Sequence, residues 1–158
     1  MLQFESGGYQ VSNAAVLLTR VIEVKPDHNV PPRYFVGVDA AMTMFSSKGA
    51  TSMASEVLVV GREREGGPLT DVVGQSCNYD SLAEGVAVPT PAPGDLLVLL
   101  AQGAYGDVTG NQMNALSRPA VVLVDDARST LAKRREELED VTRRNILPAY
   151  LWRGPHTR

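Results

Sequence analysis

Short apolar runs, each ended by glycine, proline or charged residues, most limit how this chain can fold. They are rich in Val, Leu, Ile and Thr, a composition typical of β-strands. The runs lie at residues 11–24, 34–38, 56–60, 69–74, 96–100, 119–124 and 129–134. Strands and helices do not alternate and no segment repeats, so the pattern predicts a mainly β protein with a closed or nearly closed antiparallel barrel. Residues 136–145 are acidic first and basic last, which predicts a short C-terminal helix.

Composition excludes several classes of function. The chain has 158 residues, enough for one domain or one domain with a tail, and its net charge of −3 gives no reason to expect nucleic acid or an anionic membrane as a partner. Cys77 is the single cysteine, so no disulfide can form within the chain. No signal-peptide pattern or membrane-spanning run occurs, and we expect a cytoplasmic location. His28 and His156 are too few for a zinc site or a Ser-His-Asp triad.

Two segments end an apolar strand abruptly in small and polar residues. Val73–Asp80 reads Val-Gly-Gln-Ser-Cys-Asn-Tyr-Asp, and Pro93–Val98 runs into Gly-Ala-Tyr-Gly at residues 103–106. Each segment brings one reactive or hydrogen-bonding side chain, Cys77 or Tyr105, to the mouth of a sheet. Loops held by a rigid scaffold commonly carry binding chemistry, so these are the candidate functional segments.

Together with three other segments, these two resemble the C-terminal domain of the fold-type III pyridoxal-phosphate (PLP) decarboxylases, which act on diaminopimelate, ornithine and arginine. The other segments are Glu5–Tyr9 with the strand Asn13–Val21, Val38–Met42 (Val-Asp-Ala-Ala-Met), and Arg118–Val124 (Arg-Pro-Ala-Val-Val-Leu-Val). The likeness runs in order from Glu5 to about Val141 and implies a Greek-key-like β-barrel. It divides the chain into residues 1–10 as the remnant of a preceding domain, 11–145 as the barrel, and 146–158 as an irregular tail.

The resemblance implies a role for Cys77. In the family, a cysteine here reaches across a dimer interface and helps to control protonation after CO2 departs. By itself a free cysteine is more often a small buried hydrophobic residue.

Asn78 stands where diaminopimelate-type members carry a substrate-binding glutamate, and an amide makes no charge-assisted bond to an ammonium. Asp80 is then the nearest carboxylate; it binds a distal amine or serves as a cap or turn residue before Ser81, and both interpretations stay open.

Two further residues take cofactor roles by resemblance. Tyr105, in Gly-Ala-Tyr-Gly, would donate a hydrogen bond to the PLP phosphate, whereas a tyrosine taken alone is more often a core residue with a satisfied hydroxyl. Glu5 corresponds to the glutamate that pairs with the pyridine nitrogen of PLP. The family's usual Pro-Gly-Arg is replaced here by Ser6-Gly7-Gly8, so the arginine is missing. Diaminopimelate-type members also place an arginine and a tyrosine, within the segment that corresponds to residues 42–51, to bind the distal carboxylate of the substrate. This chain has Ser47 and Thr51 in that segment.

The resemblance also indicates what the chain lacks. In the family, the lysine that binds PLP lies on an N-terminal (β/α)8 barrel, and Lys25, Lys48 and Lys133 all lie in solvated contexts. We therefore expect the chain to be inactive alone and to need PLP together with a barrel-domain chain or a full-length homologue, as a dimer acting on an amino acid. The alternative is a non-catalytic dimerisation or decoy module that binds such a homologue through exposed apolar surface. No metal is expected.

Overall fold

The computed structural model of the chain describes residues 2–5, 7–28, 33–44, 56–62, 66–77 and 79–151. The six strands of the main sheet are β1 (Leu17–Asp27), β2 (Arg33–Val38), β3 (Val57–Val59), β4 (Leu69–Val73), β5 (Ser81–Ala87) and β6 (Leu96–Leu99). A separate hairpin consists of β7 (Val121–Asp125) and β8 (Arg128–Lys133). The helical elements are η1 (Gly8–Gln10), η2 (Ser12–Ala14), α1 (Gly106–Thr109), η3 (Met113–Ala115), α2 (Leu138–Thr142) and η4 (Ala149–Leu151).

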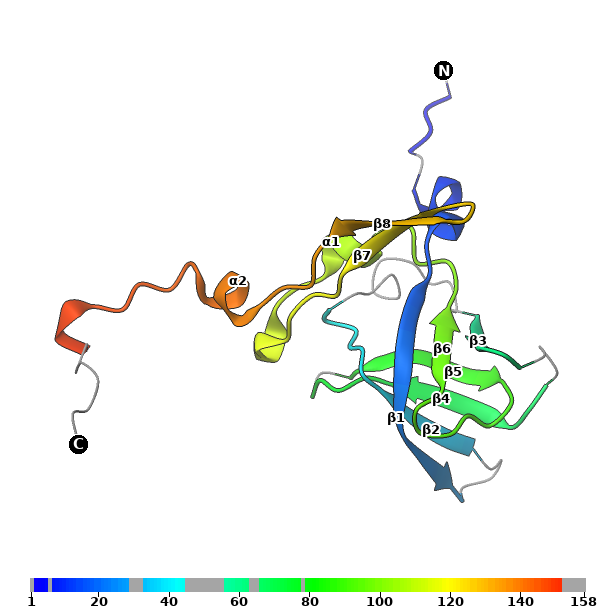
Figure 1. The fold of residues 1–158 in the computed structure, drawn as a ribbon. Coiled ribbons are helices and arrows are strands. Elements are labelled where there is room, and N and C mark those ends of the chain that lie inside the picture. Colours follow the sequence, from blue (N-terminus) through cyan, green and yellow to red (C-terminus); the bar gives the residue numbers. More distant parts are fainter. Residues whose placement is uncertain are drawn as a thin grey trace.

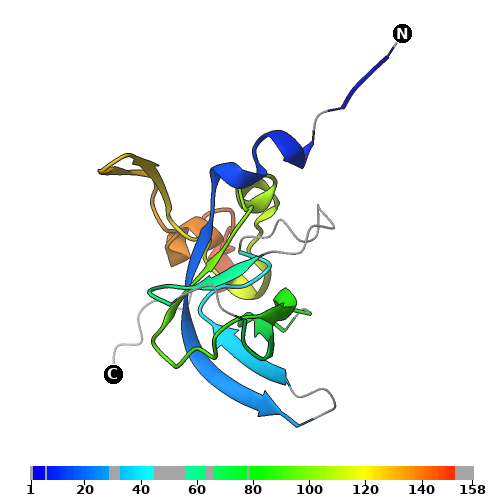
Figure 2. The same ribbon diagram turned by 90° about the vertical axis from the view of Figure 1, so that its right-hand side faces the viewer.

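The main sheet has the order β3-β6-β1-β2-β4-β5 and curves into a nearly closed barrel (Figures 1 and 2). β1 joins its two halves, because Leu17–Arg20 pair with β6 and Val21–Asp27 pair with β2. A register irregularity between Val21 and Glu23 separates these two pairings, and such a bulge bends a strand. The predicted mainly β, barrel-like fold is therefore confirmed.

One strand pair departs from the expected antiparallel pattern. β2 and β4 run parallel, with Val36 opposite Val72, whereas every other pair in the main sheet is antiparallel. Parallel neighbours need a long connection, and residues 39–68 supply it by way of β3. The carboxyl ends of β2 and β4 consequently lie at the same edge of the sheet.

The core follows from alternation along the strands. In β1, Leu17, Thr19 and Val21 point inward and are buried, while the residues between them are exposed. The neighbouring β6 contributes Leu97 and Leu99, both essentially fully buried and each paired with a β1 residue. Val36 and Val72 are also fully buried. Burial of each such side chain contributes about 1.5–3 kcal/mol relative to its exposure, so this pattern is the main source of the barrel's stability.

Two local predictions differ from the structure. The expected strand at residues 11–24 begins only at Leu17, because the Ser12 hydroxyl donates to the Gly8 carbonyl at 2.6 Å and residues 8–14 coil into η1 and η2. No strand was predicted at β5, whose sequence Ser-Leu-Ala-Glu-Gly-Val-Ala has little β-branched character. It pairs with β4 and buries Leu82 and Ala83 in the barrel. Tertiary packing thus overrides weak local propensity.

The hairpin and C-terminal helix are found close to where they were predicted. β7 and β8 pair through a tight turn in which Asp126 has a φ of 50°. Most residues of both strands are exposed, including Leu123 and Leu131. α2 follows, and the C-terminal arm (residues 137–151) extends away from the barrel (Figure 1). No helix within the described ranges is both long and apolar enough to cross a membrane.

Candidate functional site

Two of the sequence segments singled out above meet where β2 and β4 end. The segment after β2 (residues 39–44) and the one after β4 (residues 74–80, apart from residue 78) lie side by side, and we call the pair the site edge. Gln75 links them: its backbone N–H donates to the Ala40 carbonyl and its side-chain amide donates to the Asp39 carbonyl, both at 3.1 Å. The parallel pairing of the two strands is what brings these distant segments together.

Asp39 fixes the first segment to β1. Its carboxylate oxygen Oδ1 accepts hydrogen bonds from the Thr19 hydroxyl at 2.6 Å and from the Arg20 backbone N–H at 2.8 Å. The Asp39 N–H in turn donates to the Arg20 carbonyl at 3.0 Å. A carboxylate that accepts a backbone N–H makes a charge-assisted hydrogen bond, which is stronger than a neutral one. The site edge is therefore tied to β1, one of the two central strands of the sheet.

Asp80 fixes the second segment to the first. Its side chain is buried, with 9% of its surface exposed. Oδ1 accepts from the Met42 N–H at 2.5 Å, and Oδ2 accepts from the Ser76 N–H at 2.6 Å. The Gly74 N–H donates to the Asp80 carbonyl at 2.7 Å, and a Cβ on Gly74 would lie only 2.4 Å from Oδ2. Asp80 thus makes the contacts of a turn residue, although Ser81 begins a strand and not a helix, and its binding of a distal amine stays a prediction.

Cys77 lies on the turn that Asp80 closes. Its thiol belongs to an exposed residue and is free. Tyr79, two residues later, is almost fully exposed and has a φ of 39°, a conformation uncommon outside glycine. Asn78, predicted to contact substrate, lies outside the described residues. The site edge therefore presents Cys77 to solvent from a turn whose ends are held by hydrogen bonds.

Tyr105 lies on a second turn, next to the N-terminal segment. Its φ of 65° is left-handed, and its carbonyl accepts from the Thr109 N–H and hydroxyl at 2.9 and 2.8 Å. The Gly103 N–H donates to the Ser12 carbonyl at 2.8 Å, in a contact so close that a Cβ at Gly103 would lie 1.9 Å from the Val11 oxygen. Tyr105 itself is 40% exposed.

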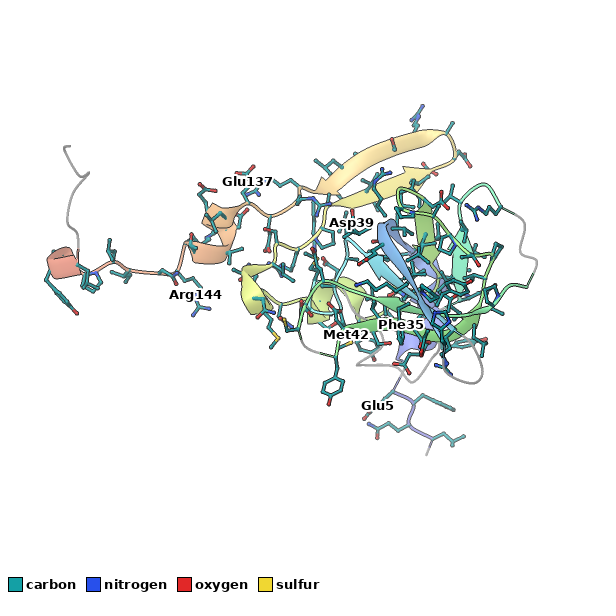
Figure 3. All side chains as sticks on the ribbon, turned by 90° about the horizontal axis from the view of Figure 1, so that it is seen from below. Glu5, Phe35, Asp39, Met42, Glu137 and Arg144 are labelled. Carbon is teal, nitrogen blue, oxygen red and sulfur yellow. The ribbon has the colours of Figure 1, made fainter. Side chains whose placement is uncertain are left out.

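The Tyr105 hydroxyl points at the segment that carries Glu5. A Cβ on Gly7 would lie 3.3 Å from that hydroxyl oxygen, so the phenol packs beside the backbone two residues from Glu5. Glu5 itself is exposed on residues that project from the barrel (Figure 3). Of the two residues predicted to bind the cofactor, Tyr105 thus packs beside the segment of chain that leads to Glu5. No contact joins either of them to Cys77 among the described residues.

Two buried hydroxyls at the site edge were not singled out in the sequence. Thr43 Oγ1 and Ser76 Oγ are buried and have no hydrogen-bond partner within the described part of the chain. Buried hydroxyls usually find a protein or water partner. Serine and threonine at these positions carry no sequence signal, since both are common in turns.

A charged groove beside the hairpin was also missed, because its residues read as solvated charge runs. It has a volume of about 560 Å3 and lies between α1, β8 and α2. Glu136 accepts from the Arg118 Nε at 2.7 Å and from its backbone N–H at 2.9 Å, and the bond from the Arg118 guanidinium lowers the pKa of Glu136 to about 2. Arg134 likewise holds the pKa of Asp140 below its usual range.

The two lysines that the structure describes are both exposed and ion-paired. Lys25 lies 3.0 Å from Glu23, and Lys133 pairs with Asp107. Both side chains are open to water, whereas an imine-forming lysine needs a desolvated pocket. Lys48 lies outside the described residues. Within those residues no three His, Cys, Asp or Glu side chains gather to hold a metal ion.

Comparisons with known proteins agree with this arrangement. Residues 9–103 match the family described as pyridoxal-dependent decarboxylase, C-terminal sheet domain. Diaminopimelate decarboxylase of Methanothermobacter thermautotrophicus is 33% identical over 153 residues, which is 96% of this chain and 35% of the relative. The enzyme of the same name from Pseudomonas aeruginosa is 37% identical over 142 residues, covering 89% and 33%.

Solved structures give the same result. The crystal structure of diaminopimelate decarboxylase from M. jannaschii has a TM-score of 0.81 and 25% identity, covering 92% of this chain and 33% of that one. The Helicobacter pylori enzyme complexed with L-lysine has a TM-score of 0.74 and 27% identity, covering 88% and 34%. The chain spans about a third of the length of the curated relatives it matches. It belongs to the pyridoxal-dependent decarboxylase family, to whose C-terminal sheet domain it corresponds.

Proposed function

We propose that this chain forms the C-terminal part of the active site of a PLP-dependent amino-acid decarboxylase, completed by a (β/α)8-barrel domain across a dimer interface. The observation that carries the proposal is the exposed Cys77 thiol on a turn fastened to the barrel by Asp39 and Asp80. A reactive group on a rigid scaffold, open to solvent on one side, is suited to act on a substrate bound by a second domain.

The chemical role of Cys77 is proton transfer. Decarboxylation breaks the bond between the α-carbon and the carboxylate, and the α-carbon must then take up one proton. A thiol can donate that proton and regain one from solvent. Cys77 meets the geometric condition for this role, because its side chain faces outward rather than into the core.

PLP supplies the electron sink for this reaction when it is bound. Tyr105 would hold its phosphate: a partly exposed phenol on a glycine-flanked turn is a suitable donor to a phosphate oxygen. Glu5, two residues before Gly7, would pair with the pyridine nitrogen, a role that we assign to it by its correspondence with the family's glutamate. The position of Tyr105 supports its assignment to the phosphate, while the assignment of Glu5 rests on the resemblance alone. Lys25 and Lys133 are exposed, and Lys48 lies outside the described residues, so it is on the family resemblance that we expect the imine-forming lysine from the barrel domain and expect the chain to be inactive alone.

Diaminopimelate is the first substrate to test, since the relatives above are diaminopimelate decarboxylases. Asn78 and Asp80 were both candidates for its distal end. The Asp80 carboxylate is buried and accepts two backbone N–H groups, which makes it the weaker candidate; Asn78 lies outside the described residues and is proposed on its sequence position alone. An amide there discriminates less strongly for a distal ammonium than a carboxylate would.

A complementation assay tests the proposal. The purified chain is mixed with PLP and a diaminopimelate decarboxylase truncated to its (β/α)8 barrel, and release of CO2 is measured. We expect CO2 only from the mixture, and a loss of at least about tenfold with Cys77→Ser, because a hydroxyl is a much poorer acid than a thiol. Lys25→Ala serves as the control that leaves the rate unchanged. CO2 release by the chain without the barrel would refute the proposal.

A non-catalytic module that binds a full-length homologue is the second candidate. The exposed apolar residues of the hairpin, Leu123 and Leu131 among them, favour it, because such surface in a small domain commonly binds protein. Titrating the chain into a full-length diaminopimelate decarboxylase distinguishes the two. Progressive inhibition supports a decoy, whereas restored activity of the barrel fragment supports the first proposal.

A further inference from the structure

The Asp80 carboxylate has an arrangement that substrate binding does not explain. Its two oxygens accept backbone N–H groups from two different segments, Met42 after β2 and Ser76 after β4. We infer that Asp80 is a positioning residue for Cys77, which fixes the thiol-bearing turn to the sheet. The effect of Asp80 on the geometry of the turn is inferred from the hydrogen bonds alone. The effect of Asp80 on catalysis rests on the proposed function, in which Cys77 transfers a proton.

Asp80 first closes the turn that carries Cys77. Ser76 immediately precedes Cys77, and Asp80 follows it by three residues. The bond from the Ser76 N–H to Oδ2 therefore closes a loop around Cys77, and the bond from the Gly74 N–H to the Asp80 carbonyl closes it a second time at 2.7 Å. Two bonds across so short a segment leave few backbone conformations for Cys77.

Asp80 also attaches that closed loop to the barrel. Oδ1 binds the Met42 N–H, 38 residues away in sequence, at 2.5 Å. A carboxylate that accepts backbone N–H groups makes bonds stronger than neutral ones, and burial limits competition from water. Removing one acceptor would leave a buried N–H without a partner, which would weaken the attachment of the turn.

Gly74 indicates that the carboxylate is seated in this position and not turned outward to a ligand. A Cβ at Gly74 would lie 2.4–2.6 Å from the three carboxyl atoms of Asp80, so the group packs directly over the glycine. Its oxygens keep lone pairs for a further donor, but an approaching amine would have to reach a buried group, of which 9% is exposed. The position is thus specific for a residue that holds the turn together.

The single cysteine makes a direct test possible. A nitroxide spin label attached to Cys77 reports the mobility of the turn through its electron paramagnetic resonance line width. We expect Asp80→Asn to give a clearly narrower, more mobile spectrum, because the amide presents a donor to one of the two N–H groups. The control is Asp71→Asn, which changes another buried carboxylate that accepts a backbone N–H, from Gly85 at 2.6 Å, but lies within β4. Circular dichroism checks that all variants are folded.

An unchanged Asp80→Asn spectrum, or equal loosening by Asp71→Asn, would overturn the inference. If Asp80→Asn fails to fold, amide hydrogen exchange of the unmodified chain decides instead. The Met42 and Ser76 amides should exchange far more slowly than in an unstructured peptide, and exchange at the peptide rate would contradict the bonds described.

The complemented enzyme separates positioning from substrate binding. We expect Asp80→Asn to lower kcat by about tenfold to a hundredfold with little change in KM, since a displaced thiol affects the reaction and not affinity. A raised KM with unchanged kcat would mean that Asp80 contacts substrate and would overturn the inference. If no mixture has activity but the spin label on Cys77 is still more mobile in Asp80→Asn, the proposed function fails, while the inference that Asp80 positions the turn is supported.

Discussion

The site edge and the C-terminal region both rely on carboxylates, but they use them differently. At the site edge, Asp39 and Asp80 accept hydrogen bonds from backbone N–H groups of the barrel. Beside the hairpin, Glu136 and Asp140 pair with the arginines Arg118 and Arg134. A backbone N–H has no side-chain freedom to lose, whereas an arginine side chain loses conformational freedom to make the same contact. The first arrangement fixes two turns to each other and to β1, and the second joins residues 118–140 to one another through side chains.

The largest difference between the regions should appear in apolar substitutions. Leu97→Ala removes a fully buried side chain from the centre of the barrel and should lower the free energy of unfolding by about 2–5 kcal/mol. Leu131→Ala, on the exposed hairpin, should change it by less than about 0.5 kcal/mol. Urea denaturation of the two variants measures both. Equal effects would mean that the hairpin is part of the same core.

Backbone approach gives the next largest effect. Gly103→Ala places a Cβ 1.9 Å from the Val11 carbonyl oxygen, so the turn before Tyr105 must move and the variant should lose about 1–3 kcal/mol. Gly66→Ala is the matched control, because a Cβ there meets nothing within 4 Å. The melting temperatures of the two variants test this prediction. Equal melting temperatures would contradict it.

The Glu136 ion pair should make a smaller, pH-dependent contribution. Its folded-state pKa of about 2 is below the ordinary 4.5, so its stabilisation is complete above about pH 4.5 and is lost as the pH falls toward 2. Glu136→Gln should be destabilised by about 1 kcal/mol at pH 7 and should approach the unmodified chain in acid. Urea midpoints measured from pH 7 to pH 2.5 test this, and a constant difference across that range would show that the charge is irrelevant.

The smallest effect is expected for the ion pair that links the hairpin to α1. Lys133→Gln removes the exposed partner of Asp107 and should cost only a few tenths of a kcal/mol, with a still smaller cost in 1 M salt. Urea denaturation at low and high salt measures the difference. A salt-independent loss would point to packing by the lysine stem in place of charge.

Much of the fold could be predicted because local patterns and turn chemistry agree with it. The apolar runs gave β2, β4 and β6 nearly to the residue, and the acidic turn at residues 125–128 gave the hairpin. β5 could not be found this way, since Leu82 and Ala83 become a strand only by packing on β4. The parallel pairing of β2 with β4 could not be predicted either, because a long connection allows the second strand to run in either direction.

The site could be predicted only as a set of segments. Motif resemblance selected Cys77, Asp80 and Tyr105, but the partners of Asp80 are backbone N–H groups, and any residue type supplies those. The nearness of the Tyr105 hydroxyl to Gly7 depends on a left-handed φ that tyrosine seldom adopts. Such contacts are properties of the folded backbone and leave little mark on sequence composition.

The parallel β2–β4 pair has a consequence for the order of events in folding. The hairpin β7–β8 closes through a turn of a few residues, so it can form within microseconds. The site edge requires residues 39–68 to loop out before β4 meets β2, and non-local closure of this kind slows folding. The turn carrying Cys77 should therefore be among the last parts of the chain to acquire its native geometry, after the hairpin is already complete.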